Sequence, residues 1–351
     1  MRKMRDSEDA PLLRRVNAEG ALPEVRCDGT ACECGMILGS TWKEALTLGA
    51  ERARSEKPWW KDRRYAKLIS RIAPHLPDLY RGMAAGAGLP ENSISTRAPD
   101  EKGECTAFAL QPSATLDHGP ISGQSKDVSM LRGMQLCVLR AKMTDAPSML
   151  TLTYPGWLFG HGFVQGGTAI FRNSLYVQTP ETGLPFAVWG VLALHCRTVE
   201  DVIELVRRYG VQVAGHVSVA DERGGVVGIE FGRGGAAFLR PKRGIYTHAN
   251  CILHNKRLQR QEKEDKIFKR CDSLNRTACL RDRLEADHGR LTAQLAYGAM
   301  CDHAGYPRSV CRHQSRSVMT ASVVVVEPLR RLLHATRGLP CQNWPRTVSL
   351  L

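Results

Sequence analysis

The order of apolar segments predicts a layered α+β fold for this chain of 351 residues. Strand-like segments, short and rich in apolar or β-branched residues, cluster after residue 105 between Gly, Pro and Asp. Helical spacing of apolar residues dominates before residue 100 and returns late in the chain. Because strands come in series and do not alternate regularly with helices, the pattern favours α+β over a doubly wound parallel sheet.

The first hundred residues are predicted to be mainly helical. Residues 1–22 are polar and charged and indicate a flexible extension. Apolar residues recur at helical spacing over 36–53. Residues 68–88 also carry helix signals, which Pro74 and Pro77 are expected to interrupt.

A β-hairpin is predicted around a cysteine. Cys105 precedes an apolar segment at 107–110, and a second segment at 121–124 leads to Asp127. The charged stretch at 99–104, just ahead, is typical of an exposed and cleavable loop. By local sequence alone, a buried core cysteine is the favoured interpretation, since Cys is among the most buried residue types.

The rest of the chain alternates between groups of strands and groups of helices. The predicted strands are 136–140, 150–154, 167–171, 211–220, 225–231, 236–239 and 318–326. The predicted helices are 185–196, one that begins at Thr198, 272–284 and 291–297. Thr198 and Asp201 form a capping-box pair at a helix start. The segment 318–326 is almost continuously apolar, which predicts a central strand.

Composition excludes several classes of protein. Hydrophobic residues make up 43% and charged residues 24%, which suits a globular chain with a sizeable core. No apolar run approaches the roughly 20 residues of a membrane span, and the basic N-terminus lacks a secretory signal, so we expect a cytoplasmic protein without a membrane partner. The net charge is +14, but Lys and Arg are dispersed and no nucleic-acid motif occurs. We therefore expect no nucleic-acid partner and a preference for anionic substrates such as an acyl-CoA.

The twelve cysteines predict reduced thiols and no metal centre. Their spacing is irregular, and only Cys27, Cys32 and Cys34 cluster. No second Cys or His pair at zinc-finger spacing follows them. We predict no bound metal and no cofactor.

A series of short motifs gives the chain a family resemblance. In order, they are CDGTACECGMILG at 27–39, Cys105-Thr106, Gly123-Gln124 with Asp127, Gly162-Phe163, Gly228-Ile229-Glu230-Phe231, His248-Ala249-Asn250, Asp272-Ser273 with Arg276, and Tyr306-Pro307 through Arg312. From about Val25 to Val326 the chain resembles the penicillin acyltransferase family. These are acyl-CoA:6-aminopenicillanic acid acyltransferases, a type of autoproteolytic cysteine N-terminal-nucleophile (Ntn) hydrolase. The resemblance implies a four-layer αββα sandwich of two stacked antiparallel sheets.

The resemblance also implies self-processing. The precursor is expected to cut itself between Glu104 and Cys105, giving an N-terminal segment that includes 23–104 and a catalytic segment of 105–351. The two fragments are expected to stay associated. Glu104 stands where the penicillin enzyme has Gly.

The implied active site has three catalytic residues. Cys105 is the expected nucleophile, and its freed α-amine, with a reference pKa of about 7.7–8.0, is the general base. Asp127 is expected to hold the amine and the thiol, and Asn250 to donate to the oxyanion. Arg312 and Phe163 are the expected substrate-binding residues.

Structural interpretations of the same residues remain open. Asp127 can cap a turn and Asn250 can end a strand. Asp272 and Arg276 stand one helical turn apart and can form a simple ion pair. Arg312 can be a buried ion-pair partner.

Three functions fit the sequence. The first is a self-processed acyltransferase or amidohydrolase that forms a Cys105 acyl-enzyme from a small amide or an acyl-CoA and passes the acyl group to an amine or water. The second is a relative that binds an acyl ligand without processing or turnover, which Glu104 motivates. The third is a Cys-rich metal or redox protein built around Cys27, Cys32 and Cys34.

Overall fold

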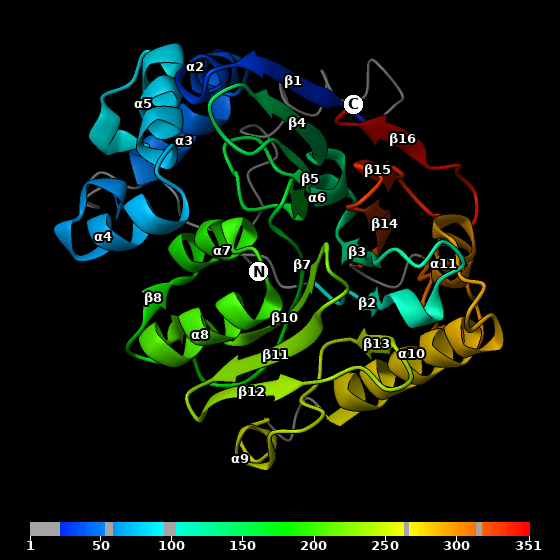
Figure 1. The fold of residues 1–351 in the computed structure, drawn as a ribbon. Coiled ribbons are helices and arrows are strands. Elements are labelled where there is room, and N and C mark those ends of the chain that lie inside the picture. The colour runs from blue at the N-terminus through cyan, green and yellow to red at the C-terminus, as the bar shows by residue number, and fades with distance from the viewer. Residues whose placement is uncertain (1–21, 53–58, 95–102, 263–266, 314–317) are drawn as a thin grey trace, which may run out of the picture.

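Two stacked β-sheets with helices on their outer faces make up the structure (Figure 1). This computed structural model describes residues 22–52, 59–94, 103–262, 267–313 and 318–351. The predicted extension at 1–22, apart from Leu22, lies outside the described residues. So does the charged loop at 99–104, apart from Gly103 and Glu104.

The first sheet has eight strands in the order β1-β4-β5-β6-β7-β10-β11-β12. Its strands are β1 (Glu24–Gly29), β4 (Cys137–Met143), β5 (Met149–Thr153), β6 (His161–Val164), β7 (Thr168–Ser174), β10 (Gly215–Asp221), β11 (Val226–Gly232) and β12 (Gly235–Leu239). The β1–β4 pairing is parallel and the other pairings are antiparallel. The segment before Cys105 thus supplies an edge strand of this sheet.

The second sheet has six antiparallel strands in the order β13-β2-β3-β14-β15-β16. They are β13 (Ile245–His248), β2 (Ala107–Leu110), β3 (Ile121–Val128), β14 (Met319–Glu327), β15 (Leu332–Ala335) and β16 (Arg346–Ser349). A separate parallel pair joins β8 (Leu184–Pro185) to β9 (Val211–Gln212). The predicted hairpin around Cys105 is confirmed as β2 and β3, and the predicted central strand as β14.

The helices complete four layers. They are α2 (Ala31–Thr41), α3 (Lys43–Arg52), α4 (Arg63–Ile72), α5 (Leu76–Ala87), α6 (Met130–Met134), α7 (Phe186–His195), α8 (Val199–Tyr209), α9 (Lys256–Gln259), α10 (Ile267–Ala286) and α11 (Ala293–Met300). β2 packs on β7 and β10, and β14 packs on β6, so the sheets lie face to face. Helices α2, α7 and α8 contact the eight-stranded sheet, and α10 and α11 contact the six-stranded sheet (Figure 1). The predicted αββα sandwich is confirmed.

The two strands at the centre of the six-stranded sheet are buried along nearly their whole length by this layering. Every residue of β3 and all but the first of β14 are buried, because the other sheet covers one face and helices cover the opposite face. Strands covered on both faces need apolar or hydrogen-bonded side chains at every position. The alternation of polar and apolar residues seen in half-exposed strands is therefore absent from β14.

Local signals located some helix ends correctly and missed others. The capping box of Thr198 and Asp201 starts α8 as predicted. Thr30 and Glu33 form a second capping box, so α2 begins before Met36, the predicted start. The predicted interruption at Pro77 is wrong, since Pro77 lies in the first turn of α5, where no intrahelical N–H donor is needed.

Strands β15 and β16 extend the six-stranded sheet beyond the last predicted strand. β15 pairs with β14, and β16 pairs with β15, through residues after Glu327 that carried no clear strand signal. No helix in the described part of the chain is long and apolar enough to cross a membrane.

Candidate active site around Cys105

Cys105 lies just before β2 and is buried, with 3% of its surface exposed. Its carbonyl oxygen accepts hydrogen bonds from Asn173 Nδ2 at 2.8 Å and from Arg276 Nη1 at 3.0 Å. Asn173 stands on β7 of the facing sheet, and Arg276 stands on α10 of the outer layer. Two layers of the fold therefore hold the backbone of Cys105.

The chain on either side of Cys105 is held against β3. Thr106 and Ser125 exchange two hydrogen bonds, from Thr106 N to Ser125 Oγ at 3.0 Å and from Ser125 N to Thr106 O at 2.8 Å. Glu104 N donates to Asp127 O at 3.0 Å. The Glu104–Cys105 peptide thus continues the β2–β3 pairing beyond the end of the strand.

The side chain of Asp127 is fully buried beside this peptide. Its Oδ1 accepts a hydrogen bond of 2.8 Å from Thr320 Oγ1, while its Oδ2 has no hydrogen-bond partner among the described residues. Burial raises the pKa of Asp127, and the positive charges of Arg276 and Arg312 oppose that shift. Asp127 is therefore a buried carboxylate with an unused acceptor.

Asn250 follows β13 and reaches the same place. Its Nδ2 donates to Gly103 O at 3.1 Å and to Ser174 O at 3.0 Å. Its Oδ1 accepts from Arg276 Nη2 at 3.1 Å. Asn250 through its side chain and Asp127 through its backbone oxygen thus contact residues 103–104, next to Cys105.

Arg276 is the centre of the hydrogen-bond network. Besides Cys105 and Asn250, it donates from Nη1 to Thr106 Oγ1 and from Nε to Asp272 Oδ2 at 3.0 Å, and its side chain is fully buried. The predicted ion pair within α10 is confirmed. No local pattern indicated that the same guanidinium also holds the backbone of Cys105.

A second buried arginine, Arg312, also binds carboxylates near Cys105. Arg312 Nη2 donates to both carboxylate oxygens of Asp272, at 2.7 and 2.6 Å, and Nη1 binds the carboxylate of Glu104. Burial disfavours the charge, but the neighbouring carboxylates of Asp127, Asp272 and Glu104 raise the pKa of Arg312. The alternative prediction, that Arg312 is a buried ion-pair partner, is confirmed.

The chain matches the model of the acyl-coenzyme A:6-aminopenicillanic acid acyl-transferase family over residues 123–320. It belongs to this family. The matched range contains Asp127, Phe163, Asn250 and Arg312 and begins after Cys105.

Solved structures with a similar chain trace include a bile acid hydrolase and a penicillin acylase. One is a conjugated bile acid hydrolase from Clostridium perfringens, with 12% sequence identity, a TM-score of 0.45, and coverage of 70% of this chain and 96% of that chain. Another is the penicillin V acylase from Agrobacterium tumefaciens, with 14% identity, a TM-score of 0.46, and coverage of 69% of this chain and 84% of that chain.

This member of the acyl-transferase family also has a chain of buried hydrogen bonds behind Asn173. Asn173 Oδ1 can only accept, so the proton of the neutral imidazole of His216 lies on Nδ1, which donates to it at 2.9 Å. His216 Nε2 then accepts from the hydroxyl of Tyr246 at 2.8 Å. Burial, followed by the stacked ring of His248, lowers the pKa of His216 and keeps it neutral. Sequence reasoning named no partner for His216.

His248 and Phe163 have structural surroundings. His248 is fully buried and pairs with Glu230, at 3.1 Å between Nε2 and Oε1, so its surroundings are those of a core residue. Glu230 also accepts from the backbone of Leu253 at 2.6 Å and so anchors the segment after Asn250. Phe163 lies on β6 with no exposed surface, within the main hydrophobic core. Its predicted contact with substrate remains a prediction.

The early cysteine cluster is divided between core and surface. Cys27 and Cys34 are buried in the main core, whereas Cys32 is exposed. In the described residues, the His, Cys, Asp and Glu side chains that converge closely enough for a metal ion lie elsewhere.

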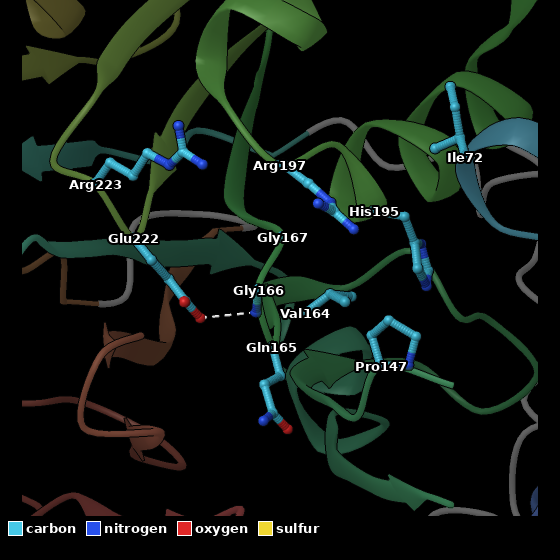
Figure 2. Close-up of a pocket in the computed structure, with 10 residues that line it drawn as sticks. All are labelled: Ile72, Pro147, Val164, Gln165, Gly166, Gly167, His195, Arg197, Glu222 and Arg223. Atoms are coloured by element: carbon cyan, nitrogen blue, oxygen red, sulfur yellow. Dashed lines mark hydrogen bonds between the residues drawn. The ribbon is translucent and has the colours of Figure 1, made fainter. Parts of the chain in front are cut away.

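Two open pockets among the described residues lie away from Cys105. Figure 2 shows one of about 440 Å³, where Gly166 N donates to Glu222 Oε1 at 2.8 Å near His195 and Arg197. A neighbouring pocket of about 540 Å³ shares His195 and also includes His75. Neither is lined by Cys105, Asp127 or Asn250.

Proposed function

We propose that this acyl-transferase family member is a self-processing Ntn enzyme that forms an acyl-enzyme on Cys105. The observation that carries the proposal is the fixation of the Glu104–Cys105 peptide, whose two residues are held by Asp127, Asn173 and Arg276. Buried polar groups from three separate elements hold this peptide in one geometry. A fixed geometry favours nucleophilic attack, because the reacting groups are already positioned.

Self-cleavage would begin at the thiol. Cys105 Sγ attacks the carbonyl carbon of Glu104, and the acyl group moves from the Cys105 nitrogen to its sulfur to give a thioester. Water then hydrolyses the thioester, which regenerates the thiol and leaves a carboxylate on Glu104 and a free α-amine on Cys105. A Cβ built on Gly103 would lie 3.1 Å from Cys105 Sγ, so glycine at this position leaves room for the thiol beside the peptide.

The same residues would serve the mature enzyme. The new amine, with a reference pKa of about 7.7–8.0, takes the thiol proton near neutral pH. Asp127 Oδ2 supplies an unused acceptor to orient that amine. Asn250 Nδ2, bound to Gly103 O in the uncut chain, becomes free to donate to an oxyanion once residues 103–104 move away.

Departure of Glu104 would also alter Arg312. In the uncut chain this arginine holds both Asp272 and Glu104. Loss of Glu104 would leave donors available in a buried site for an anionic group of the substrate. With the net charge of +14, this favours a carboxylate or an acyl-CoA as the donor molecule. An amine or water would accept the acyl group, and no cofactor is required.

The two cleaved fragments would remain associated. We place the enzyme in the cytoplasm, where its thiols stay reduced, so the association is non-covalent. Strand β1 belongs to residues 1–104 yet pairs with β4 over six residue pairs. The packing of α2 on β4, and of α4 on α7, adds buried surface between the two segments.

Intact mass measurement of the purified chain tests the proposal. We expect two products, residues 1–104 and 105–351, that co-elute on a sizing column. The variant Cys105→Ala should remain a single chain and lack activity, while Cys32→Ser, at an exposed thiol, should cleave normally. An intact wild-type chain that hydrolyses or transfers acyl groups would contradict the mechanism, because Cys105 would have no free amine.

A non-processing binder is the second candidate. The Arg312–Glu104 ion pair favours it, since this pair holds the uncut segment in place. An intact wild-type chain without turnover that still binds an acyl ligand would establish this alternative.

A further inference from the structure

Two histidines and two cysteines meet at the edge of the six-stranded sheet. Their ligand atoms, one each from His303, Cys311, His313 and Cys341, all lie within 4.8 Å of one another. His303 Nε2 and His313 Nε2 are 3.0 Å apart, and Cys341 Sγ is 3.3 Å from the same His313 nitrogen. We propose that these four side chains bind a zinc ion.

The distances suit a tetrahedral ion. Zinc binds His nitrogen at about 2.0–2.1 Å and Cys sulfur at about 2.3 Å, so the edges of its tetrahedron measure roughly 3.3–3.8 Å. The observed separations of 3.0 and 3.3 Å need little adjustment to reach them. A set of two thiolates and two imidazoles with tetrahedral geometry is typical of zinc, and four protein ligands make a closed, structural site.

Hydrogen bonding alone explains this arrangement poorly. His313 Nε2 has a single lone pair or N–H bond in the plane of its ring. It nevertheless faces both His303 Nε2 and Cys341 Sγ. One cation placed between the three atoms satisfies all of them, whereas one proton satisfies a single pair.

The surrounding structure holds the ligands in place. Cys341 lies in the turn between β15 and β16, and the hydroxyl of Tyr297 on α11 lies 2.9 and 2.6 Å from Pro340 O and Asn343 O of that turn, so that it can donate its one proton to either. Cys311 is buried, and its backbone N–H donates to Asp302 O at 2.9 Å. Hydrogen bonds of this kind orient the residues that bind a metal.

The position of the site gives it a structural task. Arg312, which binds Asp272 and Glu104 near Cys105, stands between the ligands Cys311 and His313. A zinc ion would join this short segment to the C-terminal turn at Cys341 and would thereby fix the backbone of Arg312. The zinc proposal itself does not depend on catalysis at Cys105.

Metal content and cobalt spectroscopy test the proposal. The full chain, purified in reducing buffer with zinc supplied and then desalted, should retain about one zinc per chain. Replacement by Co²⁺ should produce the intense visible bands of tetrahedral cobalt together with a thiolate-to-cobalt charge-transfer band. Cys341→Ser and His303→Ala should each weaken zinc binding at least about tenfold, as judged by competition with a chromophoric chelator.

The control variant is Cys32→Ser, which removes an exposed thiol in a different part of the fold and should leave zinc binding unchanged. A reduced wild-type chain that binds neither zinc nor cobalt would overturn the proposal. So would octahedral cobalt spectra, or a Cys341→Ser variant with the wild-type affinity. Because the cobalt spectrum is read on the wild-type chain, misfolding of a variant does not obscure the result.

Discussion

The Cys105 region and the pocket at His195 both bury ionisable groups, yet they treat charge in opposite ways. Beside Cys105, the cations Arg276 and Arg312 share the carboxylate of Asp272, at 3.0 and 2.6 Å, and Arg312 also binds Glu104. Near the pocket, His75 and His195 face each other at 3.1 Å between their Nε2 atoms. The Cys105 region pairs its buried arginines with carboxylates. The pocket at His195 instead places two imidazoles against each other with no carboxylate between them.

Electrostatics explains why the two regions differ. A buried ion is tolerated when a partner and hydrogen bonds replace its lost water, and otherwise it becomes neutral. Burial lowers the pKa of His75 and brings that of His195 to about 4, so this pair is neutral at physiological pH. The two histidines near the open pocket are therefore uncharged, although Arg197, Glu222 and Arg223 also line it, whereas the ionised groups near Cys105 are paired with one another.

The largest expected effect comes from removing the shared cation. In a Cys105→Ala background that cannot cut itself, Arg276→Met should lower the free energy of unfolding by about 3–5 kcal/mol, because Asp272 and the Cys105 carbonyl lose a buried partner. Urea denaturation measures this. The exposed Arg290, paired with Asp287, is the control, and its replacement by Met should cost less than about 1 kcal/mol. Equal losses in the two variants would contradict the view that Arg276 is the centre of the network.

The Asn250→Ala variant compares the two regions by the rate of acyl-enzyme formation. If Asn250 Nδ2 donates to the oxyanion, acyl-enzyme formation should slow by about 10²–10³-fold, which corresponds to the loss of one such donor. A burst assay on the cleaved enzyme measures this step. His195→Gln is the matched control in the other region and should leave the burst rate unchanged. An unchanged burst in Asn250→Ala would assign Asn250 a structural role.

The neutral histidine pair predicts a dependence of stability on pH. His195 has a folded pKa of about 4 against about 6.5 when unfolded, so folding favours its neutral form. Its contribution is fully present above about pH 6.5 and is lost as pH falls towards 4, by about 3 kcal/mol. His195→Gln should flatten unfolding curves over this window, and replacement of the exposed His254 should not. Identical acid sensitivity in the His195 variant and wild type would show that another group titrates.

The smallest expected effect concerns Glu104. Its side chain is 18% exposed, and Gln at this position can still accept a hydrogen bond from Arg312, so Glu104→Gln should slow self-cleavage about fivefold, or about 1 kcal/mol in the barrier, without stopping it. A time course on freshly translated protein, followed by gel bands, measures the rate. Glu104→Gly, which restores the residue of the penicillin enzyme, is the comparison. Complete loss of cleavage in Glu104→Gln would mean that the carboxylate takes part in the chemistry.

Much of the fold could be predicted from the sequence because its signals are local. The apolar segments of β2, β3 and β14 and the Thr198 cap of α8 are encoded within a few residues each. The order of motifs also predicted the family, and the family resemblance named Cys105, Asp127 and Asn250 together as the expected catalytic residues. Strands β15 and β16 escaped prediction because their short segments gain strand character only by pairing with β14.

Only the tertiary structure decided which polar groups meet. Arg276 reaches a carbonyl 171 positions earlier in the chain, and Asn173 reaches it from the facing sheet. The cluster of His303, Cys311, His313 and Cys341 likewise joins residues with none of the spacing of a zinc motif. The periodicity of a sequence encodes the face that each element buries. The contacts across that face depend on how layers stack, which is fixed by the packing of the whole core.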